Sequence, residues 1–389
     1  MRIGIDGRPL ERERTGVARY LLGLLRMWTK EHRAHEYYLY FEHEVPTDPI
    51  LDEACFTKRL PARLPLLRQN IRQLLWEQTI LPLAARRNRV DLLFSPGYTL
   101  PALFGGPAAV TIHDVSYEAH PEWSRMAQRW RLRTFSRLAA RRARVVLTDS
   151  QFSRQELLKY YRLPASKVRA IPLAADDFVR PVPAGEASRI VANRFGLKGQ
   201  YLLFVGSIFS RRHIPTLLEA FELALKDGGP ASLVLVGADS LRGSFDLSRA
   251  IEVLNLRLGR RAVVHFPRVE EDELLSLYNA ATAFIFLSDY EGFGLTLLEA
   301  MACGTPVISA RTSSIPEVVG DAAVLVSDSA DPLEVSRAIL AVSGDAERRD
   351  HMIRLGLEQA ARFSWRRCAE DTLGVLVQCG RTPAHWWGA

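Results

Sequence analysis

The feature that most restricts the fold of this chain is its regular alternation of short apolar runs with longer amphipathic stretches. The short runs are the size of buried strands, and the stretches between them repeat apolar residues at helical spacing. This order is typical of parallel sheets whose faces are covered by helices. The sequence therefore predicts an α/β chain built from doubly wound, Rossmann-like sheets.

In the first half of the chain, the pattern predicts six strands and two long helices. The helices cover residues 17–28, where Val17, Leu21 and Trp28 share one face, and residues 123–144. The predicted strands are 2–6, 37–41, 91–94, 109–113, 145–149 and 168–172.

The second half repeats the pattern after a break. Residues 172–185 contain Pro172, Pro181 and Pro183 and follow neither period, which indicates a linker. We expect domains at 1–175 and 186–364, with ligands in a cleft outside the carboxyl ends of both sheets. The predicted strands are 201–206, 233–237, 263–266, 283–287, 306–309 and 323–326, and the predicted helices are 215–226, 272–281, 293–302 and 332–342.

Composition excludes several classes of protein. The 389 residues are 48% hydrophobic and 24% charged, which excludes a disordered chain, and no apolar run reaches the length of a membrane span. The four cysteines lack zinc-site spacing, and the first residues lack the layout of a signal peptide, so a reduced, cytoplasmic protein is expected. Oligomeric state cannot be inferred from composition.

The net charge of +7 is unevenly distributed. Residues 1–175 hold 29 Lys and Arg against 17 Asp and Glu, or +12, and the remaining residues hold 22 against 27, or −5. Opposite signs indicate that the two halves have different partners.

The segment from Glu291 to Glu299 carries the densest chemical signal. Gly292 and Gly294 follow a predicted strand and open a helix, so the backbone there allows close approach of a ligand and directs amides at an anion. Glu299 lies two helical turns further on, where a carboxylate accepts hydrogen bonds from hydroxyls such as those of a ribose. The alternative is a tight strand-to-helix turn with a solvated Glu299.

Glu291, Glu299 and the following AMACGTPVI resemble the signature of the family 4 retaining glycosyltransferases, which have the GT-B fold. The resemblance spans nearly the whole chain and is greatest to the bacterial mannosyltransferase-like branch of surface polysaccharide synthesis. It extends to GRP at 7–9, TGVARY at 15–20, IHDVS at 112–116, HPEW at 120–123, DSQFS at 149–153 and IPL at 171–173.

This resemblance implies an acceptor-binding first domain and a donor-binding second domain. A C-terminal helix at about 365–380 would pack back on the first domain. Glu291 would contact hydroxyls of the donor sugar and Glu299 the ribose, while the base would lie near Val269. The backbone amides that would cradle the sugar and diphosphate are those of Gly292, Phe293, Gly294 and Leu295, and Thr296 would also bind the donor.

A basic turn follows the first strand of the second domain. After Gly206, Arg211 and Arg212 could neutralise a diphosphate leaving group through charge-assisted hydrogen bonds. The family usually has Arg-Lys-Asn here, so Arg212 and His213 depart from its pattern. The alternative is a solvated basic turn.

Two positions of the first domain complete the implied site. The resemblance places His113 at the end of a strand beside the donor sugar, and Asp114 near the acceptor. His113 would bond hydroxyls of the sugar or stabilise positive charge at the anomeric carbon through its backbone carbonyl. Gly16 would approach the diphosphate closely, and its alternative role is that of a helix N-cap. The alternative for His113 is a purely structural role.

We predict a metal-independent reaction without a cofactor, because no Asp-x-Asp triplet occurs and basic side chains with helix amides could replace a cation. A G-x-G-x-x-G dinucleotide fingerprint is also missing.

Eight arginines and several apolar residues lie in the predicted helix 123–144. This composition fits an anionic membrane or a lipid-diphosphate acceptor, or else a partly buried helix with a solvated basic face. No motif supports nucleic-acid binding. The arginines are Arg125, Arg129, Arg131, Arg133, Arg137, Arg141, Arg142 and Arg144.

The resemblance therefore implies transfer of a hexose, with mannose from GDP-mannose as the leading donor, to a saccharide or lipid-linked saccharide with retention of configuration. A UDP-sugar donor is the alternative. A non-catalytic sugar-nucleotide-binding protein, a phosphorylase and an epimerase of the same architecture are further alternatives.

Overall fold

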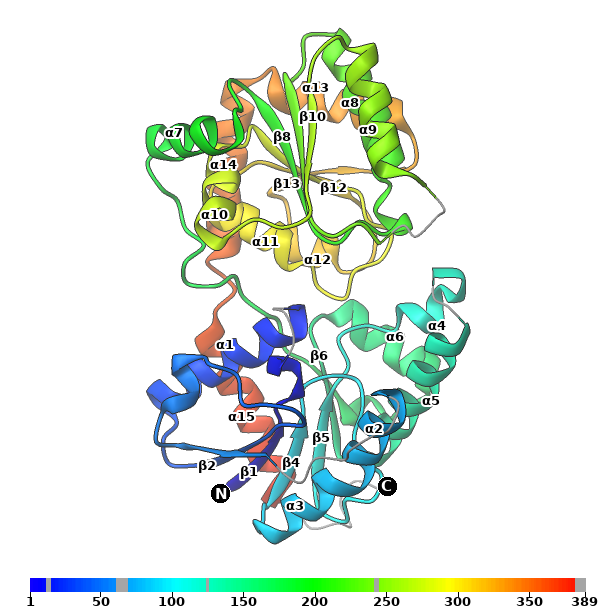
Figure 1. The fold of residues 1–389 in the computed structure, drawn as a ribbon, viewed down its shortest axis with the longest axis vertical. Helices are drawn as coiled ribbons and strands as arrows, with labels where there is room; N and C mark the ends of the chain where they lie inside the picture. Colours follow the sequence, from blue (N-terminus) through cyan, green and yellow to red (C-terminus); the bar gives the residue numbers. More distant parts are fainter. Residues whose placement is uncertain (12–14, 61–68, 124–125, 241–244, 382–389) are drawn as a thin grey trace. The chain divides into compact units, whose positions relative to one another are not determined.

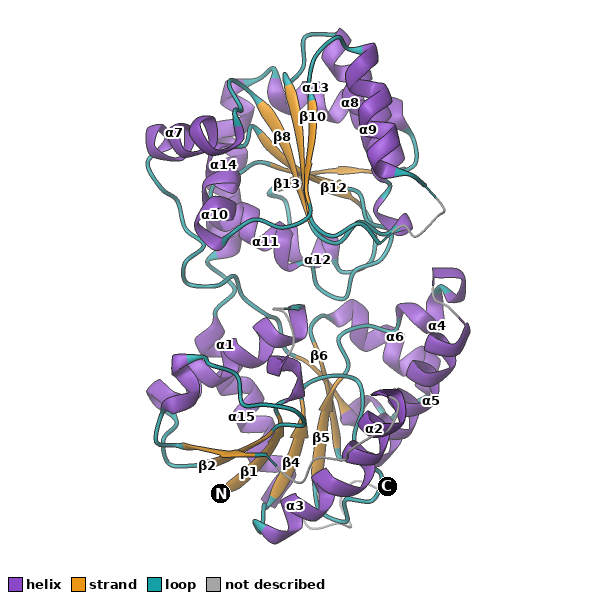
Figure 2. Ribbon diagram, in the orientation of Figure 1, coloured by secondary structure: helices purple, strands orange, loops and turns teal. Residues whose placement is uncertain are grey.

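The computed structural model describes residues 1–11, 15–60, 69–123, 126–240 and 245–381. The chain divides into two compact units, Met1–Leu173 with Ser364–Ala389, and Ala174–Phe363 (Figure 1). The first crossing between them, at Leu173, lies within residues 172–185, where the sequence indicates a linker. In both units, strands form a central sheet and helices cover it (Figure 2).

Unit 1 contains a parallel sheet in the order β3-β2-β1-β4-β5-β6-β7. Its strands are β1 (Arg2–Asp6), β2 (Glu36–Tyr40), β3 (Phe56–Arg59), β4 (Leu92–Ser95), β5 (Ala108–Thr111), β6 (Val145–Thr148) and β7 (Val168–Ala170). Its α-helices are α1 (Gly16–Glu31), α2 (Gln69–Leu75), α3 (Leu81–Arg87), α4 (Ser116–Ala119), α5 (Met126–Arg142), α6 (Gln151–Tyr161) and α15 (Trp365–Arg381).

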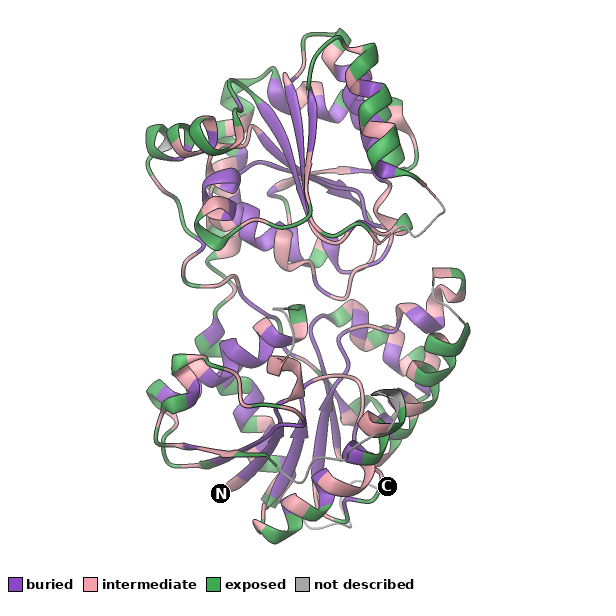
Figure 3. Cartoon of the chain, viewed as in Figure 1, coloured by how far each residue is buried: buried purple, intermediate pink, exposed green. Residues whose placement is uncertain are grey.

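The central strands of unit 1 are buried on both faces (Figure 3). Alternate residues of β4 meet different helices, because successive side chains of a strand point to opposite faces. Leu93 belongs to a core cluster with residues of α3 and α5, and Leu92 lies beside Gly380 of α15. This burial explains why β4 to β6 read as continuous apolar runs rather than as alternating ones.

The last helix, α15, belongs to unit 1 although the chain reaches it through unit 2. It packs against α1 and the central strands, and the Trp28 Nε1 group donates a hydrogen bond to the Ala369 carbonyl at 3.0 Å. At Gly23 of α1, a Cβ atom would lie 2.5 Å from the Trp365 ring, so the contact requires glycine.

Unit 2 contains a parallel sheet in the order β10-β9-β8-β11-β12-β13. Its strands are β8 (Tyr201–Val205), β9 (Ser232–Val236), β10 (Val263–Phe266), β11 (Ala283–Phe286), β12 (Val307–Ala310) and β13 (Ala323–Val326). Its α-helices are α7 (Ala184–Phe195), α8 (Ile214–Lys226), α9 (Leu247–Arg257), α10 (Glu271–Ala280), α11 (Leu295–Ala302), α12 (Ile315–Val319), α13 (Pro332–Ser343) and α14 (Ala346–Ala360).

Each sheet has one point at which the strand order changes direction. It lies between β1 and β4 in unit 1 and between β8 and β11 in unit 2. The loops that leave the two strands at such a point diverge to opposite faces of the sheet, which opens a crevice at their carboxyl ends. The two switch points are therefore the first places to look for ligand-binding residues.

The sequence predicts all the strands of unit 2 and all those of unit 1 except β3, an edge strand whose FTKR sequence has a half-polar pattern. No helix within the described ranges has both the length and the hydropathy that a membrane span requires. The four cysteines, all within these ranges, are free thiols.

Candidate functional site

Glu291 lies in the loop between β11 and α11, at the switch point of unit 2. Gly294 adopts a φ of +111° directly before α11, a conformation that favours glycine and turns the chain into the helix. A Cβ atom there would also lie 2.9 Å from the Leu297 side chain. The sequence thus sets the direction in which α11 leaves the sheet, and with it the position of Glu291.

Arg212 and Glu291 form an ion pair across the switch point. Arg212 follows β8, and its Nε and Nη2 groups both donate to Glu291 Oε1, at 3.1 and 2.9 Å. The two side chains are only 11% and 13% exposed. Arg212 Nη1 also donates to the Ser207 carbonyl at 2.7 Å, and the guanidinium lies 4.8 Å from the centre of the Phe286 ring.

Burial lowers the pKa of Arg212, because it disfavours the charged form, and the carboxylate of Glu291 opposes this effect. The guanidinium nevertheless stays protonated, since the ordinary pKa of arginine is far above neutrality. The structure therefore holds a fixed positive charge beside a carboxylate, and the alternative of a solvated basic turn is wrong for Arg212, which is mostly buried.

A second contact joins the same two loops. His213 Nε2 lies 2.7 Å from Asp289 Oδ2, and the Asp289 backbone N–H donates to the Arg211 carbonyl at 3.0 Å. Ser329, after β13, donates to the other carboxylate oxygen of Asp289 at 2.8 Å. The Arg211 guanidinium lies 4.7 Å from the Phe209 ring centre. The basic turn after β8 is thus fastened to the loop of Glu291.

Glu299 is buried in α11. Glu299 is 2% exposed, and the Tyr278 hydroxyl donates to its Oε2 at 2.9 Å. The alternative of a solvated Glu299 is therefore wrong. Tyr278 belongs to α10, so this hydrogen bond connects α10 to the middle of α11.

The other predicted donor-binding residues follow strands at the carboxyl edge of the same sheet. Gly206, with a φ of +145°, follows β8, and a Cβ atom there would overlap Arg212 Nη1. Val269 is half-buried in the loop after β10, two strands from β8, or about 10 Å at the usual strand spacing. Gly292 is half-buried and Phe293 buried, while Leu295 and Thr296 begin α11.

In unit 1, His113 lies two residues beyond β5, so the prediction that it ends the strand is wrong by these two residues. Its ring is buried, with Nδ1 2.7 Å from Asp149 Oδ2 and Nε2 2.9 Å from the Pro96 carbonyl. Burial lowers the pKa of His113, but the Asp149 carboxylate, the Pro96 carbonyl and the Asp114 carboxylate together outweigh it, so the pKa is raised. The Asp149 carboxylate and the Pro96 carbonyl both act as acceptors, so a ring that donates to both carries two N–H groups and a positive charge.

This geometry leaves the His113 ring without an N–H for a sugar as long as both contacts persist. Its backbone carbonyl accepts a hydrogen bond from Ser153 Oγ at 3.0 Å. The Asp114 carboxylate is also engaged, by the Ser116 backbone N–H at 2.8 Å and the Tyr98 hydroxyl at 3.0 Å.

Gly16 is exposed and is the first residue of α1. Thr15 is the N-cap, since its side chain accepts from the Ala18 N–H at 3.3 Å, and the alternative that Gly16 itself caps the helix is wrong. A Cβ atom at Gly16 would meet nothing within 4 Å. Packing therefore does not explain a glycine at this position.

Sequence reasoning missed Asp149, Asp289 and Ser288, although all three lie in or beside segments that it singled out. Ser288 Oγ donates to Glu291 Oε1 at 2.8 Å. The signal that could have identified them is position, because each residue directly follows a buried parallel strand or lies within three residues of its end.

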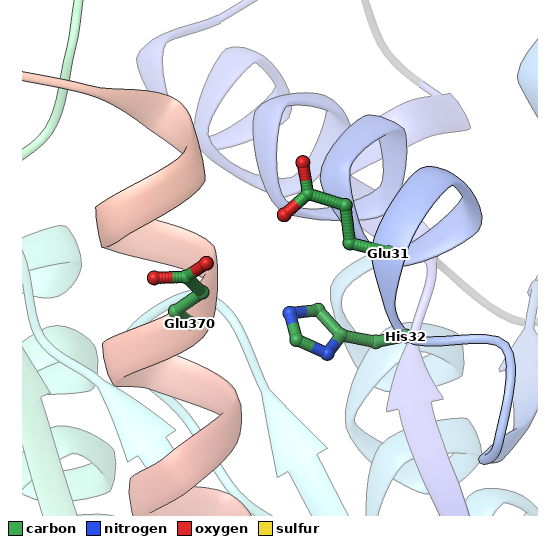
Figure 4. A group of neighbouring side chains, drawn as sticks. All are labelled: Glu31, His32 and Glu370. Atoms are coloured by element: carbon green, nitrogen blue, oxygen red, sulfur yellow. The ribbon is translucent and has the colours of Figure 1, made fainter.

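One group of side chains within the described ranges has the composition of a metal site. Glu31, His32 and Glu370 place ligand atoms within 4.8 Å of one another, at the end of α1 and on α15 (Figure 4). Arg366 Nη2 already lies 2.7 Å from Glu31 Oε1, and both glutamates are exposed. Glu31 is a full helix length, about 22 Å, from Gly16, so this group is remote from that part of the predicted site.

Family models match most of the chain in two parts. The model described as "Glycosyltransferase Family 4" matches residues 14–177, and the model described as "Glycosyl transferases group 1" matches residues 189–359. Among curated proteins, the O-antigen chain mannosyltransferase B of Escherichia coli is 31% identical over 390 residues, which cover 96% of this chain and 99% of that protein. A D-inositol 3-phosphate glycosyltransferase of Acidothermus cellulolyticus is 32% identical over 59% of this chain and 52% of that protein.

Solved structures of similar fold cover nearly the whole chain. A sucrose-phosphate synthase of Thermosynechococcus elongatus superposes with a TM-score of 0.75 and 20% identity, over 97% of this chain and 98% of that one. The Anabaena protein HepE, solved with UDP and glucose, gives a TM-score of 0.73 and 17% identity, over 97% and 100%.

Proposed function

Because the chain belongs to the family 4 glycosyltransferases and has two Rossmann-like domains of the GT-B fold, we propose that it transfers a hexose from a nucleoside diphosphate sugar with retention of configuration. GDP-mannose is the donor we favour, since the O-antigen chain mannosyltransferase is similar over almost its full length. The acceptor is a hydroxyl of a saccharide or a lipid-linked saccharide. The observation that carries the proposal is the Arg212–Glu291 pair at the switch point of unit 2.

The donor would lie at the carboxyl ends of β8 and β11. Arg211 and Arg212 would face its diphosphate, and the N-terminal amides of α11 would add hydrogen bonds to the same anion. Glu291 Oε1 already accepts hydrogen bonds from Arg212 and Ser288. Its second oxygen, Oε2, would accept a hydrogen bond from a hydroxyl of the donor sugar, and Glu299 would support the ribose.

In the reaction that we propose, the bond from the anomeric carbon to the diphosphate oxygen breaks with its electron pair on the phosphate. The acceptor oxygen attacks the same face, and its proton passes to the departing phosphate. The fixed charges of Arg211 and Arg212 would stabilise the negative charge that develops there, the task that a metal ion performs elsewhere.

Donor identity is tested by thermal shift with GDP-mannose, UDP-glucose and ADP-glucose. A ligand at 100 times its Kd stabilises the folded chain by about 2.7 kcal/mol. We expect the largest shift with GDP-mannose, undiminished by EDTA, and an α-linked product by NMR. A larger shift with UDP-glucose would assign the alternative donor, while an inverted product or a loss of activity with EDTA would overturn the corresponding part of the proposal.

The second partner that we propose is an anionic membrane surface that contacts unit 1. Nine of the twelve large hydrophobic residues that are exposed within the described ranges lie between Leu60 and Leu138. Met126 is 86% exposed, Trp130 66% and Leu103 60%. Exposed apolar groups at this density mark interaction surfaces in soluble proteins.

Hydrogen bonds connect three elements that carry part of this surface. Arg86 of α3 donates to the Leu103 carbonyl at 2.9 Å, and Arg142 of α5 donates to the Gly106 carbonyl at 3.0 Å. The loop of Leu103 is therefore fixed between α3 and α5, and we call these three elements the α3–α5 face. Exposed cations, Arg87 of α3 and Arg131 of α5 among them, lie on the same elements. Apolar groups interspersed with cations fit the interface of an anionic bilayer.

A further inference from the structure

Three consecutive hydroxyl residues, Thr312, Ser313 and Ser314, lie in the turn between β12 and α12. β12 is the neighbour of β11 in the sheet, so this turn lies beside the loop that carries Glu291. All three side chains form hydrogen bonds with the backbone of that loop, between Ser288 and Phe293.

Each hydroxyl contacts a different group. Thr312 Oγ1 donates to the Ser288 carbonyl at 2.7 Å, and Ser313 Oγ accepts from the Glu291 N–H at 3.0 Å. Ser314 Oγ lies 2.9 Å from the Glu291 carbonyl and 2.8 Å from the Phe293 carbonyl. The backbone N–H and C=O of Glu291 are therefore both held by side chains of this one turn.

The Glu291 side chain is fixed through the same turn. Ser288, whose carbonyl is held by Thr312, donates its own hydroxyl to Glu291 Oε1 at 2.8 Å. Within the described ranges, the hydrogen bonds to the carboxylate reach Oε1, from Ser288 and Arg212. These contacts restrain the torsions of the Glu291 side chain, and all of them hold the same carboxylate oxygen.

Ser313 adopts a φ of +51°, in the left-handed region that L-residues other than asparagine, aspartate and histidine rarely enter. Glycine would adopt this conformation without strain but would lack the hydroxyl. The serine at this position thus keeps an unfavourable backbone conformation and supplies the oxygen that the Glu291 N–H contacts.

We propose that Thr312, Ser313 and Ser314 are positioning residues for Glu291. They act through the backbone of residues 288–293 and set the direction of the carboxylate that meets the donor sugar. The inference rests on the proposed function, because it assigns these residues a role in sugar transfer. It deepens that function by naming the part of the chain that orients Glu291.

The matched variants are Thr312→Val, which keeps the side-chain shape without the hydroxyl, and Thr312→Ser, which keeps the hydroxyl. We expect Thr312→Val to lower kcat at least tenfold with the donor KM changed less than twofold, because misplacement of a reacting group by about 1 Å costs up to 100-fold in rate. Thr312→Ser should retain kcat within about threefold. Ser313→Gly relieves the backbone strain and removes the hydroxyl, so it should lower kcat without lowering Tm. Ser313→Asn offers another oxygen and should keep a higher kcat than Ser313→Gly does.

A double-mutant cycle with Glu291→Ala separates positioning from a purely structural role. In that background, Thr312→Val should have no further effect on kcat, whereas independent contributions would multiply. Wild-type kcat in both Thr312→Val and Ser313→Gly, or multiplicative effects in the cycle, would overturn the positioning role. A wild-type protein that transfers no hexose from any nucleotide sugar would instead overturn the proposed function, so the two failures are distinguishable.

Discussion

Arg212 donates two hydrogen bonds to one oxygen of Glu291, at 3.1 and 2.9 Å, and so connects the turn after β8 to the loop after β11. A diphosphate that reaches this point would compete with the carboxylate for the guanidinium. The family resemblance assigns the two residues to separate parts of the donor. The structure places them in one charge pair, so a change in either affects both.

Glu291→Gln tests the carboxylate with the least damage to this pair. The amide oxygen still accepts from Arg212, but the negative charge is lost, and we expect kcat to fall by about 100-fold or more. Glu291→Ala should lower kcat further, to a small residual rate, and also lower the free energy of unfolding by about 3 kcal/mol, because it leaves a mostly buried guanidinium without its partner. Urea titration and kinetics of both variants check this, and a fully active Glu291→Gln would contradict the site.

The expected loss of stability in Glu291→Ala depends on an ion pair that the sequence alone does not predict. The pair joins residues 79 positions apart and depends on β8 and β11 being neighbours in the sheet. Local signals, such as the glycines around Phe293, predict the turn and the helix that follows it. They do not report which distant side chain lies opposite, because strand order and side-chain direction are set by packing of the whole sheet.

Arg212→Lys should not substitute for arginine. The guanidinium bonds Ser207 and Glu291 in different directions and lies on the Phe286 ring, which a single ammonium group cannot reproduce. We expect a loss of about 1–3 kcal/mol in unfolding free energy and at least a tenfold fall in kcat/KM for the donor. Arg211→Lys is the matched control and should reduce stability less. Equal stability of the two variants would show that the buried geometry of Arg212 is unimportant.

The His113–Asp149 pair predicts a pH dependence of stability. The pKa of His113 is raised in the folded chain above its unfolded value of about 6.5. Its contribution is therefore fully present below about pH 6.5 and is lost as the pH rises through the folded-state pKa. Tm measured between pH 5.5 and 9 should fall more steeply in the wild type than in Asp149→Asn, where the pair is absent. Parallel curves would refute a charged His113.

This pair also shows where prediction from sequence stops. His113 and Asp149 both lie in segments that resemble the family, yet their contact follows from the pairing of β5 with β6. Because both ring nitrogens of His113 have protein acceptors, its implied role of donating to the sugar hydroxyls is less direct than that of Glu291. Its fixed charge, in contrast, follows from the geometry.

If the α3–α5 face contacts membranes, substitutions on this face should weaken vesicle binding, and substitutions elsewhere should not. Trp130→Ser and Leu103→Ser should each weaken sedimentation with phosphatidylcholine vesicles that contain phosphatidylglycerol by about tenfold, since each removes a large exposed apolar group. Leu256→Ser, equally apolar and 71% exposed on α9 of unit 2, is the control and should bind as the wild type does. Binding should also weaken with salt. Unchanged binding of both unit 1 variants, or none by the wild type, would exclude this partner.

Gly16→Ala separates a ligand-contacting glycine from a merely structural one. A methyl group at the first residue of α1 meets no atom within 4 Å, and alanine favours the helix by up to about 1 kcal/mol, so Tm should stay equal or rise. If the diphosphate of the donor approaches this backbone closely, the same methyl group occupies its place, and the donor KM should rise at least tenfold. Thr15→Ala, which removes the N-cap, should do the opposite, lowering stability by about 1 kcal/mol with little effect on KM. A Gly16→Ala variant with wild-type donor KM would show that the glycine serves only the start of the helix.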